Sequence, residues 1–173
     1  MEDIFVVRQQ GGLTDDELRA ALEQSLQGRN LRRVLIIPPD FTRFHSQAGK
    51  ITNLYYHLLK ARGVLVDILP ALGTHAPVTK EQWQLMYGDI PYECMMIHDW
   101  RRDVLRLGEV PAEYVKQVTE GLWQDPVDVE INRRIMDPAY DLIISPGQVV
   151  PHEVVGMANH AKNLFVGVGG NGM

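Results

Sequence analysis

The chain has 173 residues, of which 45% are hydrophobic and 23% are charged. These proportions are ordinary for a folded globular protein, and the length suits a single domain over residues 1–173 with a core of its own. The formal net charge of -5 and the lack of any lysine- or arginine-rich block argue against nucleic-acid binding.

The cysteine content and the first residues of the sequence favour a cytoplasmic protein. The single cysteine, Cys94, excludes an intramolecular disulfide and suits a reducing compartment, and its apolar neighbours predict a buried, inert thiol. The first residues lack the basic segment of a signal peptide. No apolar run reaches the roughly 18 residues of a membrane span. A glycine-rich end, 169–173, follows an apolar run directly, and we expect further protein beyond it.

Start signals mark two helices in the first half of the chain. Residues 14–17 (Thr-Asp-Asp-Glu) form a capping box, and the apolar stripe that follows predicts a helix ending near Gly28. A second capping box begins another helix at residues 79–82. Between these helices, short apolar runs predict buried strands and a helical period predicts one more helix. The strands are 34–37 and 64–69, and the helix is 47–62.

The second half of the chain is less regular. Residues 101–125 have no clear period, and we predict no element there. Alternation at 127, 129 and 131 predicts a half-exposed strand or hairpin arm. Further strands are expected at 95–97, 142–144 and 164–168, with a short helix at 132–137. Because strands and helices alternate, the sequence predicts an α/β domain with a mostly parallel sheet flanked by helices.

Polar and ionisable side chains follow the predicted strands. In a parallel sheet these turns lie at one edge, the carboxyl ends of the strands, where open α/β sheets bind ligands. We therefore expect one crevice to receive the side chains of Asp40, Arg43, His75, His98 and His152.

Each of these residues has a structural and a functional interpretation. Asp40 and Arg43 are either a helix cap and a surface charge, or an arginine that binds an anion beside an aspartate that orients a hydroxyl or the arginine. His75 lies in a Gly-Thr-His-Ala-Pro loop, which favours function. For His98 a structural hydrogen bond is favoured. Lys162 either packs its stem with its ammonium in water, or is a partly desolvated amine that bonds covalently to a cofactor.

Three motifs, in order along the chain, resemble the lactate racemases that use a nickel-pincer nucleotide, and related 2-hydroxy-acid racemases and epimerases. The family's Asp-His-Thr-Arg-Pro turn corresponds to residues 40–44, and its Thr-Gly-Thr-His-Arg-Pro loop to residues 72–77. Its Pro-His, Gly and later Lys correspond to Pro151-His152, Gly156 and Lys162. The similarity is to the N-terminal domain of these two-domain enzymes, over about residues 34–162.

The resemblance implies a role for each matching residue. Lys162 would link covalently to the pyridinium-derived cofactor, which Asp40, Thr42 and Arg43 would also bind. His75 and His152 would flank the substrate as the acid/base pair. The implied reaction removes the hydroxyl proton of a small 2-hydroxy acid while the Cα hydride moves to the cofactor. Return of the hydride to the other face of the resulting 2-keto acid inverts the centre.

The sequence also departs from the family pattern. Phe41 and Phe44 replace a histidine and a proline, and residues 158–161 read Ala-Asn-His-Ala in place of Ser-Gly-Gly-Arg. These changes point to a 2-hydroxy acid other than lactate. The family's nickel-binding histidine lies downstream of the lysine, and no histidine follows His160. We therefore assign no metal ligand, with His160 as a possible substitute, and expect the nickel ligand and the C-terminal domain beyond Met173. The chain alone is expected to be inactive.

Two other functions fit the same residues. The first is a non-catalytic α/β domain in which Asp40, Thr42 and Arg43 hold a phosphate or a carboxylate. The second is a hydrolase with a metal site formed by His75, His98, Asp99 and His152. The metal site has the weaker support, because the histidines come from separate loops without a short ligand spacing.

Overall fold

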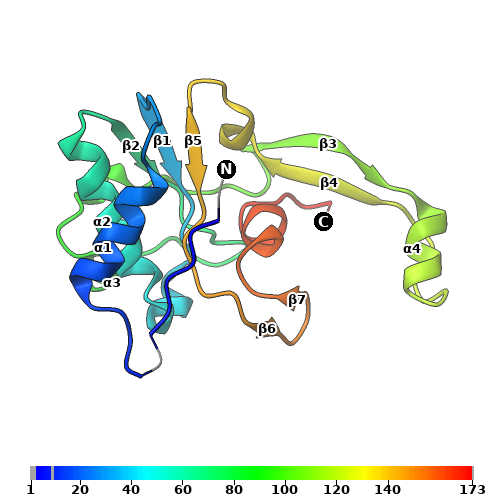
Figure 1. Ribbon diagram of the computed structural model, residues 1–173. Helices are drawn as coiled ribbons and strands as arrows, with labels where there is room; N and C mark the ends of the chain where they lie inside the picture. Colours follow the sequence, from blue (N-terminus) through cyan, green and yellow to red (C-terminus); the bar gives the residue numbers. More distant parts are fainter. Residues whose placement is uncertain (1–2, 9, 173) are drawn as a thin grey trace.

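The computed structural model describes residues 3–8 and 10–172, and at its centre lies a three-stranded parallel sheet (Figure 1). The strands are β1 (Arg33–Ile36), β2 (Leu65–Ile68) and β5 (Leu142–Ile144), in the order β2-β1-β5. Both pairings are parallel. The predicted parallel sheet is confirmed, and the carboxyl ends of its strands share one edge.

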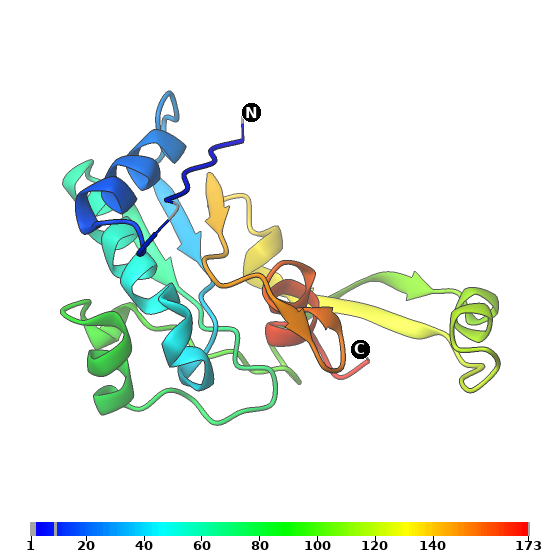
Figure 2. The ribbon, with the colours of Figure 1, turned by 60° about the horizontal axis from the view of Figure 1, so that its bottom comes forward.

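Three helices lie on one side of this sheet (Figures 1 and 2). They are α1 (Asp15–Ser25), α2 (Ala48–Ala61) and α3 (Lys80–Tyr87). The Thr14 and Thr79 hydroxyls accept the backbone N–H groups of Glu17 and Gln82, and both capping boxes are complete. All three predicted helices are confirmed, with ends that differ from the predicted ones by a few residues.

The middle strand β1 is covered on both faces, as its continuous apolar run predicted. Alternate side chains point to opposite faces of a strand. Val34 and Ile36 belong to the larger core under the three helices. Leu35 and Ile37 belong to a second core on the other face, which the C-terminal part of the chain covers with Val168 and Leu164.

The predicted strand at 164–168 is wrong, because these residues belong to a π-helix, Lys162–Gly167, and the turn after it. The backbone N–H of Val168 donates to the carbonyl of Asn163, five residues earlier, at 3.0 Å. A short apolar run cannot separate a buried strand from a turn of buried helix, because both cover a core. Here Leu164 and Val168 face the same core because they are one helical turn apart.

The predicted strand at 95–97 is reduced to a single contact. Met95 forms an isolated parallel bridge with Ile68 at the free edge of β2, directly after a short 3-10 helix, Tyr92–Cys94. Cys94 is half-buried rather than buried, and its thiol lies 3.8 Å from the Tyr56 hydroxyl. The chain leaves the sheet after one bridge, so no ladder forms.

An antiparallel arm extends away from the sheet (Figures 1 and 2). Strands β3 (Val104–Val110) and β4 (Val127–Asn132) pair along it, and α4 (Ala112–Val118) lies at its tip. The alternation in β4 and the short 3-10 helix Arg133–Met136 that follows it were predicted, but β3 and α4 were not. Most apolar side chains in β3 and α4 are exposed, so no buried face gives this stretch a period.

No helix in residues 3–8 and 10–172 is long and apolar enough to cross a membrane.

Candidate active site

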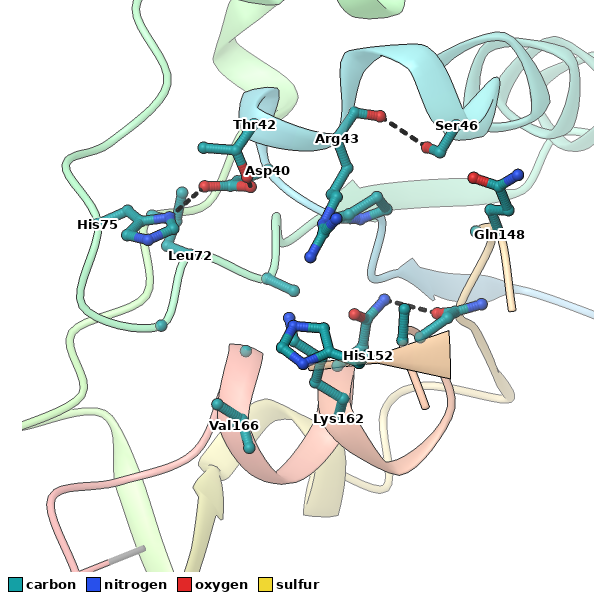
Figure 3. A pocket seen from close by; sticks show the side chains of 18 of the residues that line it. Asp40, Thr42, Arg43, Ser46, Leu72, His75, Gln148, His152, Lys162 and Val166 are labelled. Atoms are coloured by element: carbon teal, nitrogen blue, oxygen red, sulfur yellow. Dashed lines mark hydrogen bonds and ion pairs between the residues drawn. The ribbon is translucent and has the colours of Figure 1, made fainter. Parts of the chain in front are cut away.

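A cavity of about 350 Å³ opens at the carboxyl ends of β1, β2 and β5, between the loops after these strands and the π-helix (Figure 3). Its volume lies in the range of pockets that bind small molecules and cofactors. The structure brings all six predicted catalytic and cofactor-binding residues to its lining: Asp40, Thr42, Arg43, His75, His152 and Lys162.

Separate elements deliver these side chains to the cavity. Residues 40–43 follow β1 and open a 3-10 helix, Phe41–Ser46, while His75 lies on the loop after β2. That loop is fixed to the π-helix by a hydrogen bond from the Gly73 backbone N–H to the Gly167 carbonyl at 2.7 Å. His152 ends a two-residue strand, β6 (Pro151–His152), which pairs with β7 (Gly156–Met157).

Asp40 forms a pair with His75. One carboxylate oxygen of Asp40 lies 2.6 Å from Nδ1 of His75, and the other accepts the hydroxyl of Thr42. The Asp40 side chain is 9% exposed, whereas the His75 side chain is 58% exposed. A buried carboxylate therefore holds a solvent-accessible imidazole. The helix-cap interpretation of Asp40 is wrong, because its side chain makes no capping bond. The hydroxyl that Asp40 accepts is that of Thr42, and its ion-pair partner is His75 rather than Arg43.

The loop that carries Asp40 is anchored from below by Tyr87. The Tyr87 hydroxyl, fully buried in the core, donates to the carbonyl of Pro39 at 2.9 Å. Burial, with the nearby charge of Asp40, raises the pKa of Tyr87, so the hydroxyl stays protonated and keeps donating. This contact joins the core under α3 to the position of the Asp40 carboxylate.

His152 lies across the cavity with a different set of partners. Its Nδ1 accepts the backbone N–H groups of Val154 and Val155 at 3.1 and 3.4 Å. The side chain is only 10% exposed. Glu153 beside it has a lowered pKa, because a hydrogen bond from its own backbone and the neighbouring side chains of His152, Arg43 and Lys162 favour its ionised form.

Arg43 and Lys162 bring positive charge to the same space. Both line the cavity, and Arg43 points toward His152 (Figure 3). Neither has a side-chain hydrogen bond or ion pair with any of the residues described, 3–8 and 10–172. Glu153 also lines the cavity and acts on both charges, but only without direct contact. A guanidinium and an amine without a directly bonded carboxylate favour a ligand that carries carboxylate or phosphate groups.

A buried amide network beneath Lys162 was not predicted. The Asn159 side-chain oxygen accepts from the Asn163 amide at 2.7 Å and from the Ser145 hydroxyl at 3.0 Å. Asn159 and His160 both have positive φ, 58° and 46°. Asn is among the residues that adopt this conformation most readily. The only sequence signal was that Asn159 and His160 stand where the family motif has glycines.

His98 does not reach the cavity. It is buried, its Nε2 donates to the Gly169 carbonyl at 2.9 Å, and its Nδ1 accepts the Asn132 amide at 3.0 Å. The structural interpretation of His98 is confirmed, and its place in the predicted crevice is wrong. The proposed metal group of His75, His98, Asp99 and His152 does not form. No cluster of three or more His, Cys, Asp or Glu side chains suited to a metal ion occurs among the residues that the structure describes.

The environment of His98 predicts a pH-dependent stability. Burial lowers its pKa below the ordinary value of 6.5, so the unfolded chain binds this proton more readily than the folded one. The stabilisation is complete above pH 6.5 and is lost as the pH falls below it. We expect the unfolding free energy to drop by up to about 1.4 kcal/mol per pH unit. Urea unfolding at several pH values measures this slope. If the unfolding free energy of His98→Gln changes with pH as steeply as that of the unsubstituted chain, His98 is not the source of the pH dependence.

Comparison with known proteins agrees with the fold. The sequence model of the lactate racemase N-terminal domain matches residues 15–172, nearly the whole chain. The chain belongs to this family. No curated protein matches this chain.

Two solved structures have the same fold. A protein from Thermotoga maritima superposes with a TM-score of 0.83 at 23% identity, over 92% of this chain and 39% of that one. The lactate racemase apoprotein from Thermoanaerobacterium thermosaccharolyticum gives 0.64 at 20% identity, over 88% of this chain and 37% of that one. The lactate racemase-like domain therefore spans about two-fifths of the length of these relatives.

Proposed function

We propose that this chain is the N-terminal catalytic domain of a two-domain racemase or epimerase of 2-hydroxy acids that uses a nickel-pincer nucleotide. One observation carries the proposal: the six residues matched to the family motifs line a single cavity at the carboxyl ends of the parallel strands. The partner of the domain is then a small 2-hydroxy acid, together with the remainder of a longer polypeptide.

The residues of the cavity suit the proposed cofactor. Lys162 offers an amine for a covalent link to a carboxyl-derived group, and this amine makes no hydrogen bond or ion pair with the residues that the structure describes. Arg43 offers a guanidinium for a phosphate or carboxylate. When bound, the nucleotide would supply an acceptor for the hydride of Cα, which no side chain of the cavity can provide.

His75 and His152 then supply the proton transfers. Nε2 of His75 is the free nitrogen of an imidazole held by Asp40, so it can take the hydroxyl proton of a substrate in the cavity. Arg43 can orient the substrate carboxylate. His152 approaches from the other wall. Two histidines on different loops let the cavity accept either enantiomer.

Nickel would have to arrive with the cofactor and gain its protein ligand elsewhere. His160 is exposed and does not line the cavity, so the structure offers no support for it as a substitute ligand. Nδ1 of His75 and Nδ1 of His152 are bound to Asp40 and to the turn after His152, and their Nε2 atoms have the proton-transfer roles proposed above. We therefore propose that the metal ligand lies in the remainder of the polypeptide.

The test is attachment of the cofactor to Lys162. The chain is co-expressed with the enzymes that make the nickel-pincer nucleotide, and its intact mass and metal content are measured. We expect a mass increment that maps to Lys162, with up to one nickel per chain. Lys162→Ala should lose the increment completely, because no other lysine lines the cavity among residues 3–8 and 10–172.

Lys80→Ala is the matched control, because Lys80 is exposed at the start of α3 and outside the cavity, so this variant should keep the increment. A chain with an unmodified Lys162 and no nickel, from a host that loads a known racemase in parallel, would remove the proposed function. That outcome would leave an α/β domain that binds a phosphate or carboxylate through Asp40, Thr42 and Arg43.

A further inference from the structure

The two histidines of the cavity present different nitrogens to their protein partners. Nδ1 of His75 lies 2.6 Å from the Asp40 carboxylate. An ionised carboxylate only accepts hydrogen bonds, so Nδ1 of His75 must carry a proton. In the neutral imidazole the other nitrogen, Nε2, is then bare and able to accept a proton.

His152 has the reverse arrangement. Its Nδ1 accepts two backbone N–H groups, of Val154 and Val155, at 3.1 and 3.4 Å. The Glu153 carboxylate lies farther from the same nitrogen, at 3.6 Å, which is beyond hydrogen-bond distance. Backbone N–H groups only donate, so Nδ1 of His152 must be bare. The single proton of the neutral ring is then on Nε2.

We propose that the resting site holds its two histidines in opposite tautomers, His75 with a bare Nε2 that accepts a proton and His152 with an Nε2–H that donates a hydrogen bond. Asp40 is the positioning residue for the first tautomer, and the 152–155 turn holds the second. The partner of an imidazole's other nitrogen sets its tautomer in many enzyme sites.

This arrangement makes the two walls of the cavity chemically unequal. A substrate hydroxyl beside His75 can lose its proton at once: the O–H bond breaks, an N–H bond forms at Nε2, and the imidazolium stays paired with Asp40. A hydroxyl beside His152 meets an N–H instead. His152 can take a proton only after its own moves from Nε2 to Nδ1, which breaks both bonds to the turn. A neutral imidazole N–H can still polarise a substrate oxygen.

The consequence for the two enantiomers rests on the proposed function, whereas the proton positions do not. The resting site is ready to oxidise the enantiomer whose hydroxyl faces His75, and it must rearrange before it oxidises the other. The proposed cofactor, when bound, would supply the acceptor for the hydride of the same step, so electrons would balance. The Asp40 carboxylate is buried and also bonded to Thr42, so its place is fixed before any ligand binds.

The test is nitrogen NMR of the histidine rings in the 173-residue chain, without cofactor or substrate. Long-range ¹H–¹⁵N correlation spectra near neutral pH separate protonated from bare ring nitrogens, with assignments from single His→Gln variants. We expect His75 to be protonated at Nδ1 and His152 at Nε2. If both rings show the same tautomer, or if either shows the reverse of its expected one, the inference is overturned.

Two substitutions probe the causes separately. Asp40→Asn should mix the tautomers of His75 and leave His152 unchanged, whereas Val154→Pro removes one donor to His152 and should leave His75 unchanged. The matched control is Asp89→Asn, which alters an exposed Asp–His pair outside the cavity, Asp89 with His57 at 2.9 Å. It should change neither cavity histidine.

If Asp40→Asn folds and the His75 spectrum does not change, Asp40 does not set the tautomer of His75. If that variant fails to fold, the spectra of the unsubstituted chain still decide the two tautomers. If the chain never gains the cofactor but its two histidines have opposite tautomers, the proposed function is removed and this inference stands. If the protein is loaded and active but both histidines have the same tautomer, the proposed function stands and this inference is overturned.

Discussion

Replacing His75 by asparagine in the full-length, cofactor-loaded polypeptide is expected to lower its racemisation rate by about 100- to 10,000-fold, the range typical of a lost general base. Asparagine can keep the hydrogen bond to Asp40 but has no nitrogen that accepts a proton at neutral pH. The rate is measured from either pure enantiomer of a 2-hydroxy acid by chiral chromatography.

The matched control is His57→Asn, the same substitution at an exposed Asp–His pair outside the cavity. It should leave the rate within about twofold, since an exposed ion pair contributes little. The mass increment on Lys162 shows that each variant is loaded. A loaded His75→Asn protein that racemises as fast as the His57→Asn protein would exclude His75 as the base.

The sequence was sufficient where local chemistry decides the structure. The boxes at Thr14 and Thr79 predicted α1 and α3 because a side chain and a backbone N–H three residues apart satisfy each other without the rest of the chain. The continuous apolar run of β1 predicted a strand covered on both faces. The parallel order of the strands then placed the loops at 40–43, 72–75 and 145–152 along one edge.

The sequence was insufficient where contacts between distant segments decide the secondary structure. The run at 164–168 covers a core as a helix or as a strand equally well, and only its packing under Leu35 and Ile37 selects the π-helix. In β3 and α4 the exposed side chains leave no periodic signal.

For the site, the sequence predicted which residues share the cavity but not which of them pair. Asp40 has Arg43 three residues away and His75 thirty-five residues away, and it pairs with the distant one. Nearness along the chain favoured Arg43, but the loop after β2 brings His75 over the carboxylate. His98 also follows the edge of the sheet, yet its ring turns inward because Asn132 and Gly169 offer a donor and an acceptor in the core.

Gly49→Ala is expected to destabilise the fold by about 3 kcal/mol, the upper end of the usual cost of overpacking. Gly49 lies in the first turn of α2, where an added Cβ would fall 2.0 Å from the backbone oxygen of Met86 in α3. A backbone oxygen cannot turn aside as a flexible side chain does, so the two helices must separate. Urea unfolding monitored by circular dichroism measures the loss.

Gly12→Ala is the control, because nothing lies within 4 Å of a Cβ at Gly12. It should change the unfolding free energy by less than about 0.5 kcal/mol. The separation of α2 and α3 should also reach the site, since Tyr87 follows Met86 and holds the Pro39 carbonyl beside Asp40. In Gly49→Ala the tautomer of His75 should therefore become mixed even where the chain remains folded. If Gly49→Ala is as stable as Gly12→Ala, α2 and α3 do not approach this closely. The proposed link from the core through Tyr87 to Asp40 would then be contradicted.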